Sequence, residues 1–322
     1  MTVLVTGGAG YIGSHTVRAL REAGRDVVVL DTLELGRRDA LLGAPLVEGD
    51  IRDATVVQEL CSDYGVTAIV HFAAYKSVGE SMQSPGKYWH NNVDGTATLV
   101  EAAMRAGVRD IVFSSSCSVY GTPAEVPVVE GAVIAPESVY AESKAMVERV
   151  LRWYGVTHGL RSICLRYFNA AGASRDTVIG EDWTFSINLV PLVMKALLGA
   201  GPPVKVFGDD YPTPDGTCIR DYIHVEDLAE AHIKALDQLG TGEGRSLGIN
   251  IGTGVGSSVL DVIRTTERVA GRPVPHEIVA RRAGDPVSTY ADPAYAESVL
   301  GWRSAQGLTE IVESAYRWHS KG

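Results

Sequence analysis

A glycine-rich segment directly after the first apolar run constrains the fold of this chain more than any other feature. Val3–Val5 predicts a buried strand, Ile12–Ala23 predicts a helix, and residues 6–13 between them read TGGAGYIG. The glycines fit both Gly-x-Gly-x-x-Gly and Gly-x-x-Gly-x-x-Gly spacing. Such a turn lets a diphosphate lie against bare backbone at the positive end of a helix, where a Cβ would intrude.

The next predicted strand supports a dinucleotide site at this turn. Val27–Leu30 is apolar and ends in Asp31, which follows Gly13 by 18 residues. A carboxylate near that spacing binds ribose hydroxyls and repels a 2′-phosphate, so it favours NAD over NADP. Arg37 and Arg38 complicate this preference, since nearby cations could accept the phosphate. The alternative is a tight strand-to-helix turn without a ligand, but the strand–turn–helix–strand–acid order favours a dinucleotide.

Composition excludes several classes of partner. The 322 residues carry a net charge of −10 without basic runs, which argues against nucleic acid and anionic membranes. No apolar stretch approaches the ~20 residues that cross a bilayer. Neither the eight histidines nor the cysteines show the spacing of metal ligands, so we predict no metal and reduced thiols in a cytoplasmic protein. The four cysteines are Cys61, Cys117, Cys164 and Cys218.

Strand-like and helical segments alternate over the first 170 residues. After Asp31 we predict strands and helices at 45–50, 54–64, 68–74, 88–106, 110–116, 138–154 and 162–168. Apolar runs without alternation, joined by helices, predict an α/β fold with a doubly wound, Rossmann-like parallel sheet. We expect residues 1–170 to form the dinucleotide-binding domain, with 216–252 returning to it. The Gly-, Pro- and Asp-rich remainder, 171–322, would form a smaller mixed α/β substrate domain.

Ligands of parallel sheets bind beyond the carboxyl ends of the strands. We therefore expect one cleft lined by Gly7, Asp31, Asp50, Ala73, Ser116 and Phe168. Tyr140 and Lys144 are four residues apart and would stack on one face of a helix. Ionising a tyrosine at neutral pH requires about 4 kcal/mol, and a cation about 5 Å away supplies about 3 kcal/mol. With Ser116 nearby, this pair predicts proton transfer; the alternative is an exposed helix pair.

Further segments extend the pattern: Tyr11–His15, His71–Ser81, Tyr167–Asn169 and Ile219–Val225. Together with the glycine turn and Tyr140–Lys144, they resemble the extended short-chain dehydrogenase/reductase superfamily. Within it they are similar to the UDP-galactose 4-epimerase family, from residue 1 to about residue 300. The resemblance implies redox-neutral epimerisation of a UDP-sugar at C4 with tightly held NAD. It also implies a homodimer formed through the helices at 88–106 and 138–154.

The resemblance assigns roles to individual residues. Tyr140 would take the proton of the sugar 4-hydroxyl, Ser116 would share that hydrogen bond, and Lys144 would bind the nicotinamide ribose and lower the pKa of Tyr140. The implied NAD contacts are Gly7, Gly10, Tyr11, Ile12, Gly13, Asp31, Asp50, Ile51, Phe72, Ala73, Ala74, Lys76, Asn91, Ser116, Tyr140, Lys144 and Phe168. The implied UDP-sugar contacts are Asn169, Asn188, Leu189, Phe207, Arg220, Arg282 and Asp285. Thr32 departs from the family, which usually has Asn there.

Differences from neighbouring families reduce the number of reactions that the chain is expected to catalyse. The 4,6-dehydratases carry Asp–Glu directly after the active-site hydroxyl, and UDP-glucuronate decarboxylases carry a Glu at the second of those positions. Here the two positions hold Cys117 and Ser118, which lack a carboxylic acid. A UDP-arabinose or UDP-glucuronate 4-epimerase remains an alternative, as does a non-catalytic NAD-sensing regulator. Such regulators commonly lose the Tyr or the Lys, and this chain keeps both.

One pocket position bears on the sugar. Thr289 falls where narrow-specificity members of the family carry a bulky tyrosine. A small residue there would leave room for a 2-acetamido group, so we hypothesise that N-acetylated UDP-hexosamines are also substrates. The neighbouring Tyr290 would restore the bulk if the correspondence shifted by one residue.

Overall fold

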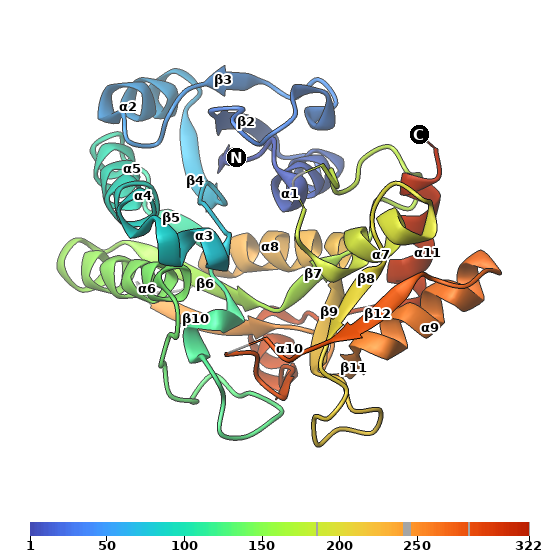
Figure 1. The fold of residues 1–322 in the computed structure, drawn as a ribbon. Helices are drawn as coiled ribbons and strands as arrows, with labels where there is room; N and C mark the ends of the chain where they lie inside the picture. The colour runs from blue at the N-terminus through green and yellow to red at the C-terminus, as the bar shows by residue number, and fades with distance from the viewer. Residues whose placement is uncertain (185, 241–245, 283, 322) are drawn as a thin grey trace.

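A parallel sheet with helices on both faces occupies the N-terminal half of the chain (Figure 1). The computed structural model describes residues 1–184, 186–240, 246–282 and 284–321. In these residues the strands of this large sheet lie in the order β10-β6-β5-β4-β1-β2-β3, and each neighbouring pair is parallel. They are β1 (Thr2–Thr6), β2 (Asp26–Asp31), β3 (Leu46–Glu48), β4 (Val66–His71), β5 (Asp110–Ser114), β6 (Arg161–Tyr167) and β10 (Ser246–Ile251).

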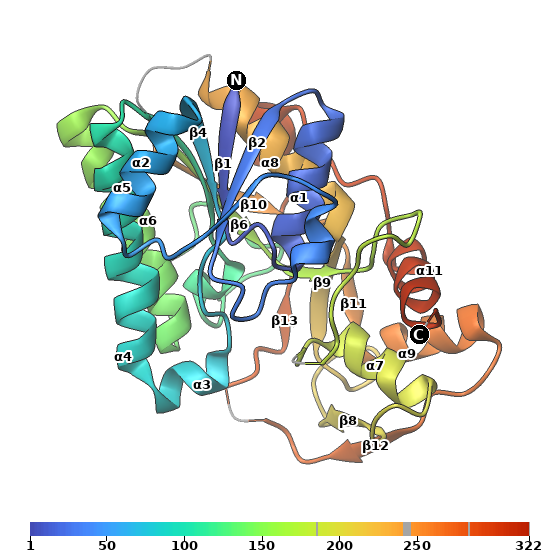
Figure 2. The same cartoon turned by 90° about the horizontal axis from the view of Figure 1, so that it is seen from above.

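Two helical layers cover this sheet. Val3 and Val5 of β1 face a core shared with α1 and α8, whereas Leu4 faces a second core shared with α2, α5 and α6. Burial on both faces explains why the strand sequences are continuously apolar. The helices are α1 (Tyr11–Glu22), α8 (Val225–Leu239), α2 (Ala54–Asp63), α5 (Gly95–Arg105) and α6 (Val139–His158). Figure 2 shows the sheet edge-on between the two layers, which confirms the predicted doubly wound α/β fold.

The predicted helix at 88–106 is present, but it begins earlier and its first part is π-helical. After α3 (Val78–Gln83), α4 (Pro85–Tyr88) leads into a π-helical turn over Trp89–Asp94, and α5 follows directly. Such π-turns insert an extra residue into a helix and are frequent at functional sites. The predicted strands 68–74 and 110–116 are also too long. Because β4 ends at His71 and β5 at Ser114, Ala73 and Ser116 lie in the loops beyond them.

Shorter elements build the C-terminal half. A mixed sheet contains β7 (Asn169–Ala171), β9 (Ile219–His224), β11 (Gly256–Ser258) and β13 (Ser288–Thr289), and β8 (Val204–Phe207) pairs with β12 (His276–Val279). The helices of this half are α7 (Leu189–Leu197), α9 (Val259–Ala270), α10 (Ala294–Leu300) and α11 (Leu308–His319). A third core of buried aliphatic residues fills the space between α7, α9, α11 and these strands.

The chain passes between the halves more than once. β9 pairs with the small sheet, whereas α8 packs against α1 and β10 pairs with β6 of the large sheet. The predicted return at 216–252 covers both α8 and β10, and its glycine-rich residues 241–245 lie outside the described residues. Across the described chain, no helix is both long enough and apolar enough to span a bilayer.

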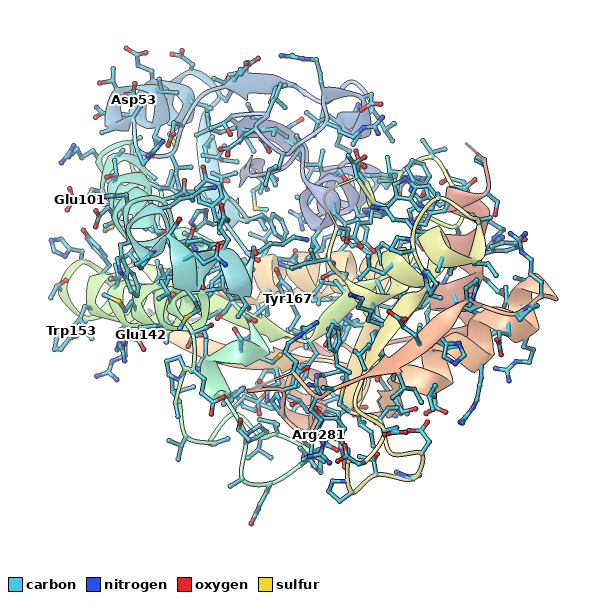
Figure 3. The ribbon with its side chains drawn as sticks, in the orientation of Figure 1. Asp53, Glu101, Glu142, Trp153, Tyr167 and Arg281 are labelled. Atoms are coloured by element: carbon cyan, nitrogen blue, oxygen red, sulfur yellow. The ribbon has the colours of Figure 1, made fainter. Side chains whose placement is uncertain are left out.

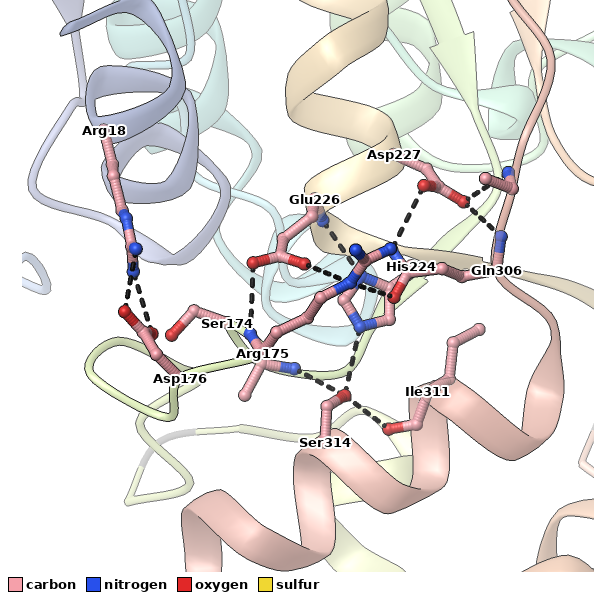
Figure 4. A network of polar contacts seen from close by, with 12 residues as sticks. Arg18, Ser174, Arg175, Asp176, His224, Glu226, Asp227, Gln306, Ile311 and Ser314 are labelled. Carbon is pink, nitrogen blue, oxygen red and sulfur yellow. Dashed lines mark hydrogen bonds and ion pairs between the residues drawn. The ribbon is translucent and has the colours of Figure 1, made fainter. Parts of the chain in front are cut away.

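Polar contacts fix the C-terminal half against α1 and α8 (Figure 4). The imidazole of His224, at the end of β9, contacts the Ser314 hydroxyl of α11 at 3.1 Å through Nε2 and accepts from the Glu226 amide through Nδ1. Arg18 of α1 forms an ion pair with Asp176 at 2.7 Å. The small sheet is therefore held at the carboxyl edge of the large one, where the predicted cleft opens.

Candidate active site

The glycine turn between β1 and α1 is closely packed by backbone. A Cβ on Gly7, whose φ is +69°, would lie 2.6 Å from the amide nitrogen of Ala73 in the loop after β4. A Cβ on Gly13 would collide with the Gly7 carbonyl and lie 2.8 Å from the Gly8 Cα. Gly10 is the N-cap of α1, and no side chain of the described residues caps that helix. The turn therefore offers free amide groups at the positive end of a helix, which fits a dinucleotide diphosphate.

The first residues of α1 anchor the cradle to both halves. The Tyr11 hydroxyl donates to the Gly172 carbonyl at 2.6 Å, and burial raises the pKa of Tyr11. Ile12 packs against the core that α1 shares with α8.

Asp31 lies against the same turn. Its two carboxylate oxygens accept from the backbone amides of Ala9 and Leu33, each at 2.9 Å. Arg37 pairs with Asp39 at 2.5 Å, and Arg38 pairs with Glu48 at 2.8 Å. Because acidic partners already engage both arginines, the arrangement fits NAD better than a 2′-phosphate.

The loop after β3 supplies the next pair of predicted contacts. Ile51 is buried against the core under α2 and α5. Asp50 is half-buried, and the guanidinium of Arg52 at 2.6 Å holds the pKa of Asp50 below its usual value.

The loop after β4 forms the opposite wall of the turn. Phe72 packs its ring 4.7 Å from that of His232, and Ala73 approaches Gly7 as described above. Ala74 follows in the same loop and is half-buried. Lys76 is largely exposed, with its ammonium 3.9 Å from the buried carboxylate of Glu181.

The π-turn carries two adjacent asparagines, Asn91 and Asn92, of which only Asn91 was identified from the sequence. Asn91 donates to the side-chain oxygen of Asn92 at 3.0 Å. Asn92 is buried and bonds both backbone groups of Tyr75 and the hydroxyl of Ser143 on α6. Asn92 thus joins the loop after β4 to the helix that carries Tyr140. Its position next to Asn91 was the one feature of the sequence that could have indicated it.

The predicted catalytic residues converge at the carboxyl ends of β5 and β6. Ser116 caps the 3₁₀ turn Cys117–Tyr120, and its Oγ accepts from the amide and hydroxyl of Ser118. Tyr140 lies in the first turn of α6, and the Lys144 ammonium lies 5.8 Å from its ring centroid. Burial raises the pKa of Tyr140, nearby Tyr167 raises it further, and a hydrogen bond with Ser116 lowers it.

Lys144 is buried beneath the tyrosine. Its ammonium donates to the Ser114 carbonyl at 2.8 Å and lies 4.8 Å above the Phe113 ring. Desolvation lowers the pKa of Lys144 to about 7, while Cys164 and Glu148 oppose that shift. The Tyr167 hydroxyl contacts the Ser114 hydroxyl at 2.5 Å, so Tyr167, labelled at the centre of Figure 3, also belongs to this group. Phe168 is buried behind it, against Ala145 of α6.

The predicted substrate residues gather on the small sheets. Arg220 of β9 donates to the carbonyls of Ile219 and Pro286 and lies 3.6 Å from Asp285. The Arg282 guanidinium lies 4.3 Å above the ring of Phe207 and 4.0 Å from the Asp285 carboxylate. Two arginines, one aromatic face and one carboxylate thus form a single cluster.

Arg220 of this cluster lies close enough to the segment after β5 to act electrostatically on Cys117. Burial raises the pKa of Cys117, next to Ser116, and the charge of Arg220 opposes that increase. Asn169 begins β7 directly after Phe168 and is exposed.

The start of α7 holds two further predicted substrate residues. Asn188 is its N-cap, Leu189 is its first residue, and no described side chain caps the helix. The Asn188 amide instead donates to Glu181 at 2.8 Å, a partner that no sequence motif indicated. The amides of Leu189 and Val190 therefore have no side-chain cap among the described residues, and Pro191 after them has no amide hydrogen.

Thr289 is the last residue of β13, and Tyr290 follows directly after the strand. Thr289 pairs with Arg220 in register and is 7% exposed, and its hydroxyl lacks a hydrogen-bond partner among the described residues. The Tyr290 ring lies beside Gly256 of β11. Thr289 is therefore beside Arg220 in the sheet, whereas the Tyr290 ring packs beside β11.

Two histidines near strand ends have structural partners. The ring of His71 contacts the hydroxyls of Thr6 and Thr96, at 2.6 and 2.8 Å, and desolvation lowers the pKa of His71 to about 3. His224 is bonded to Ser314, as described above. Among the described residues, no group of three or more His, Cys, Asp or Glu side chains could hold a metal ion.

Comparison with known proteins identifies the family. The model of the NAD dependent epimerase/dehydratase family matches residues 3–252. A UDP-glucose 4-epimerase of Halalkalibacterium halodurans is 44% identical over 322 residues, covering 100% of this chain and 96% of that protein.

Two solved structures share the fold over the whole chain. The UDP-glucose 4-epimerase of Stenotrophomonas maltophila, solved with NAD and formylated UDP-arabinopyranose, has a TM-score of 0.96 at 41% identity, covering 100% of this chain and 98% of that one. The UDP-Glc/GlcNAc 4-epimerase of Campylobacter jejuni has a TM-score of 0.87 at 38% identity, covering 100% and 99%. This chain therefore belongs to the NAD-dependent epimerase/dehydratase family, in which its full-length relatives are UDP-glucose 4-epimerases.

Proposed function

We propose that the protein is an NAD-dependent 4-epimerase that interconverts UDP-glucose and UDP-galactose through a transient 4-keto sugar. The proposal rests on Ser116, Tyr140 and Lys144, which follow strands of the sheet that also carries the glycine turn, and on the cluster of Arg220, Arg282 and Asp285 in the C-terminal half. The names of full-length relatives supply the reaction class.

The NAD site consists of three walls. The free amides of the glycine turn bind the diphosphate, Asp31 binds the adenosine ribose, and the loop after β4 closes the other side. When bound, NAD supplies hydride acceptance and return at C4 of the sugar. The proposed contacts are Gly7, Gly10, Tyr11, Ile12, Gly13, Asp31, Asp50, Ile51, Phe72, Ala73, Ala74, Lys76, Asn91, Ser116, Tyr140, Lys144 and Phe168.

Tyr140 is the proposed acid–base group. Its phenolate removes the proton of the sugar 4-hydroxyl, and its phenol returns a proton after the keto sugar has turned in the pocket. Since burial raises the pKa of Tyr140, the phenolate needs a nearby positive charge. The Lys144 ammonium supplies that charge, and Ser116 shares the hydrogen bond.

The UDP part of the substrate must stay fixed while the sugar turns. Arg220 and Arg282 suit the diphosphate because guanidinium groups bind phosphate in bidentate geometry. Phe207 offers an aromatic face and Asp285 a hydrogen-bond acceptor in the same cluster. Asn169, Asn188 and Leu189 complete the proposed pocket. We assign UDP-sugar binding mainly to residues 171–322, and NAD binding to residues 1–170 together with 216–252.

A second substrate pair is proposed from Thr289. Its side chain is small, and its buried hydroxyl has no hydrogen-bond partner among the described residues, so we propose that a 2-acetamido substituent is accommodated at this position. The similar Campylobacter jejuni protein is named as a UDP-Glc/GlcNAc epimerase, which agrees with this reading. UDP-arabinose is kept as a third candidate because the similar Stenotrophomonas protein was solved with a formylated UDP-arabinopyranose.

We further propose a cytoplasmic homodimer. A groove of about 590 Å³ runs along α6 beside Ala97 of α5 and is lined by Trp153, which is 59% exposed, and Val156 on the same helix is 69% exposed. Trp153 lies at the outer side of α6 (Figure 3). Covering so large an apolar surface is a common function of an interface between subunits. The four cysteines are free thiols, which fits a reducing compartment.

One assay tests the proposed function. Purified protein is incubated with UDP-galactose without added cofactor, and the products are separated by chromatography. We expect conversion to an equilibrium mixture with UDP-glucose and no net release of NADH. A protein that binds NAD but converts no UDP-sugar would support the alternative of an NAD-sensing regulator.

A further inference from the structure

A buried ion pair lies directly beneath the proposed catalytic residues and has no part in the function proposed so far. Glu148 of α6 and Arg166 of β6 are 13% and 11% exposed at their side chains, and they approach to 2.6 Å. The Nε of Arg166 also donates to both oxygens of Glu148, at 3.0 and 3.2 Å. A buried pair of this kind costs desolvation energy, so it is weak evidence for stability alone.

Glu148 continues the catalytic face of α6. Tyr140, Lys144 and Glu148 follow one another at intervals of four residues, so they occupy successive turns on one side of the helix. The carboxylate of Glu148 is therefore the next charged group along the helix from the Lys144 ammonium.

The same carboxylate holds the segment that carries the catalytic serine. Ser115 donates its hydroxyl to Glu148 at 2.5 Å. The residue before it, Ser114, accepts from the Lys144 ammonium through its carbonyl, and the residue after it is Ser116. Fixing Ser115 therefore fixes the direction of both neighbouring groups.

Arg166 keeps Glu148 in place from the other side. It donates to the Tyr120 hydroxyl at 2.9 Å, and Tyr120 donates to the buried amide oxygen of Asn250 at 2.7 Å. The pair is thus tied to β10 and to the turn that follows Ser116.

The other titratable groups around Lys144 are a thiol, a phenol and an imidazole. Burial raises the pKa of Cys164 on β6 and of Tyr140, and burial lowers the pKa of His71 on β4. Among the described groups that act on Lys144, Glu148 is the carboxylate, and together with Cys164 it opposes the loss of the lysine proton.

We propose that Glu148 is a positioning residue of the active site: it fixes Ser114–Ser116 through Ser115 and keeps the Lys144 ammonium protonated, while Arg166 holds it in place. This inference rests on the proposed function, because the need for a charged Lys144 comes from the proton transfer by Tyr140.

The test is the titration of Lys144 in Glu148→Gln, a variant that keeps the shape but removes the charge. The ¹³Cε resonance of Lys144 in lysine-labelled protein is followed against pH and assigned by its loss in Lys144→Arg. We expect its midpoint to fall by about half to one pH unit. The alkaline limb of the kcat profile should move in the same direction, with KM for UDP-galactose unchanged.

Two matched variants separate charge from geometry. Ser115→Ala keeps the charge but removes the hydrogen bond, so kcat should fall several-fold while the Lys144 midpoint stays in place. Glu142→Gln removes a carboxylate from the surface of the same helix, where it pairs with Arg149 at 2.5 Å. Neither measurement should change in that variant.

An unchanged Lys144 midpoint in folded Glu148→Gln would overturn the proposal. If that variant does not fold, the double variant Glu148→Leu/Arg166→Met removes both charges together, an exchange that buried pairs often tolerate. Its midpoint should also fall, because Arg166 is not among the groups that act on Lys144. The resonance needs no turnover, so a lowered midpoint in a protein without epimerase activity would refute the proposed function and leave the Glu148–Lys144 coupling intact.

Discussion

The proposed cofactor side and sugar side of the site differ in structure: backbone atoms form the first wall, and side chains form the second. On the cofactor side, backbone meets backbone: Gly7 and Gly13 leave no room for a Cβ, and backbone amides hold Asp31. On the sugar side, the side chains of Arg220 and Arg282 project from short strands and loops. A wall made of backbone tolerates few substitutions, whereas a wall made of side chains can change its specificity without changing the fold.

The largest effect is expected where the two walls meet. Tyr140→Phe should lower kcat by roughly 10²–10⁴-fold, since it removes the acid–base hydroxyl without disturbing either wall. The initial rate of UDP-galactose conversion measures this, with retained NAD quantified by absorbance. Tyr154→Phe is the matched control, because that hydroxyl bonds Glu101 at the surface. Near-native turnover in Tyr140→Phe would mean that the base is misassigned.

Adding one methyl group to the glycine turn should weaken NAD binding and destabilise the protein at the same time. Gly13→Ala pushes a Cβ into the Gly7 carbonyl, so we expect NAD affinity to fall by on the order of 100-fold and stability by about 1–3 kcal/mol. Calorimetric titration with NAD and urea unfolding report the two effects. Gly86→Ala is the control, because a Cβ there meets nothing within 4 Å. Normal NAD binding by Gly13→Ala would contradict the backbone description.

Substitutions in the side-chain wall should raise KM by amounts that differ from one arginine to the other. Arg220→Met is expected to raise KM for UDP-galactose by about 10–100-fold, the value of one or two charged hydrogen bonds. Arg282→Met should have a smaller effect, because its side chain is 61% exposed against 16% for Arg220. Steady-state kinetics of both variants test the order. If both variants raise KM equally, or if either variant changes the affinity for NAD, the proposed division into a cofactor wall and a sugar wall is wrong.

The smallest expected change alters specificity alone. Thr289→Tyr should lower turnover of UDP-N-acetylglucosamine about 10-fold or more while UDP-galactose turnover stays near the native rate, because only the acetamido group needs the space. Competition between the two substrates in one reaction measures the ratio directly. If the native protein does not convert the N-acetylated sugar, Thr289 does not set the pocket size.

Local patterns were enough to predict the fold and most of the cleft. Asp31 and Ser116 were placed at strand ends by apolar runs, and parallel strands bring their carboxyl ends to one edge. The arginine cluster came from family resemblance, since no local pattern joins Arg220 to Arg282. Neither approach predicted the π-turn before α5, which depends on packing against α6 and the loop after β4.

Local sequence patterns also failed to indicate several polar residues of the site. Asn92, Glu181 and Glu148 carry no motif, yet each contacts a side chain that is distant in the chain: Asn92 bonds Ser143, Glu181 lies 3.9 Å from the Lys76 ammonium, and Glu148 pairs with Arg166. Their importance depends on burial, and burial depends on which elements pack together.

The amino-acid order alone determined the parallel sheet, the glycine turn and the i, i+4 pair of Tyr140 and Lys144, because these follow from spacing along one strand or helix. Only the tertiary structure decided that Arg166 meets Glu148, that Asn188 bonds Glu181 instead of capping α7, and that Thr289 lies beside Arg220 while Tyr290 packs beside Gly256. Contacts between distant segments depend on how layers and loops pack, and a linear pattern does not encode that packing.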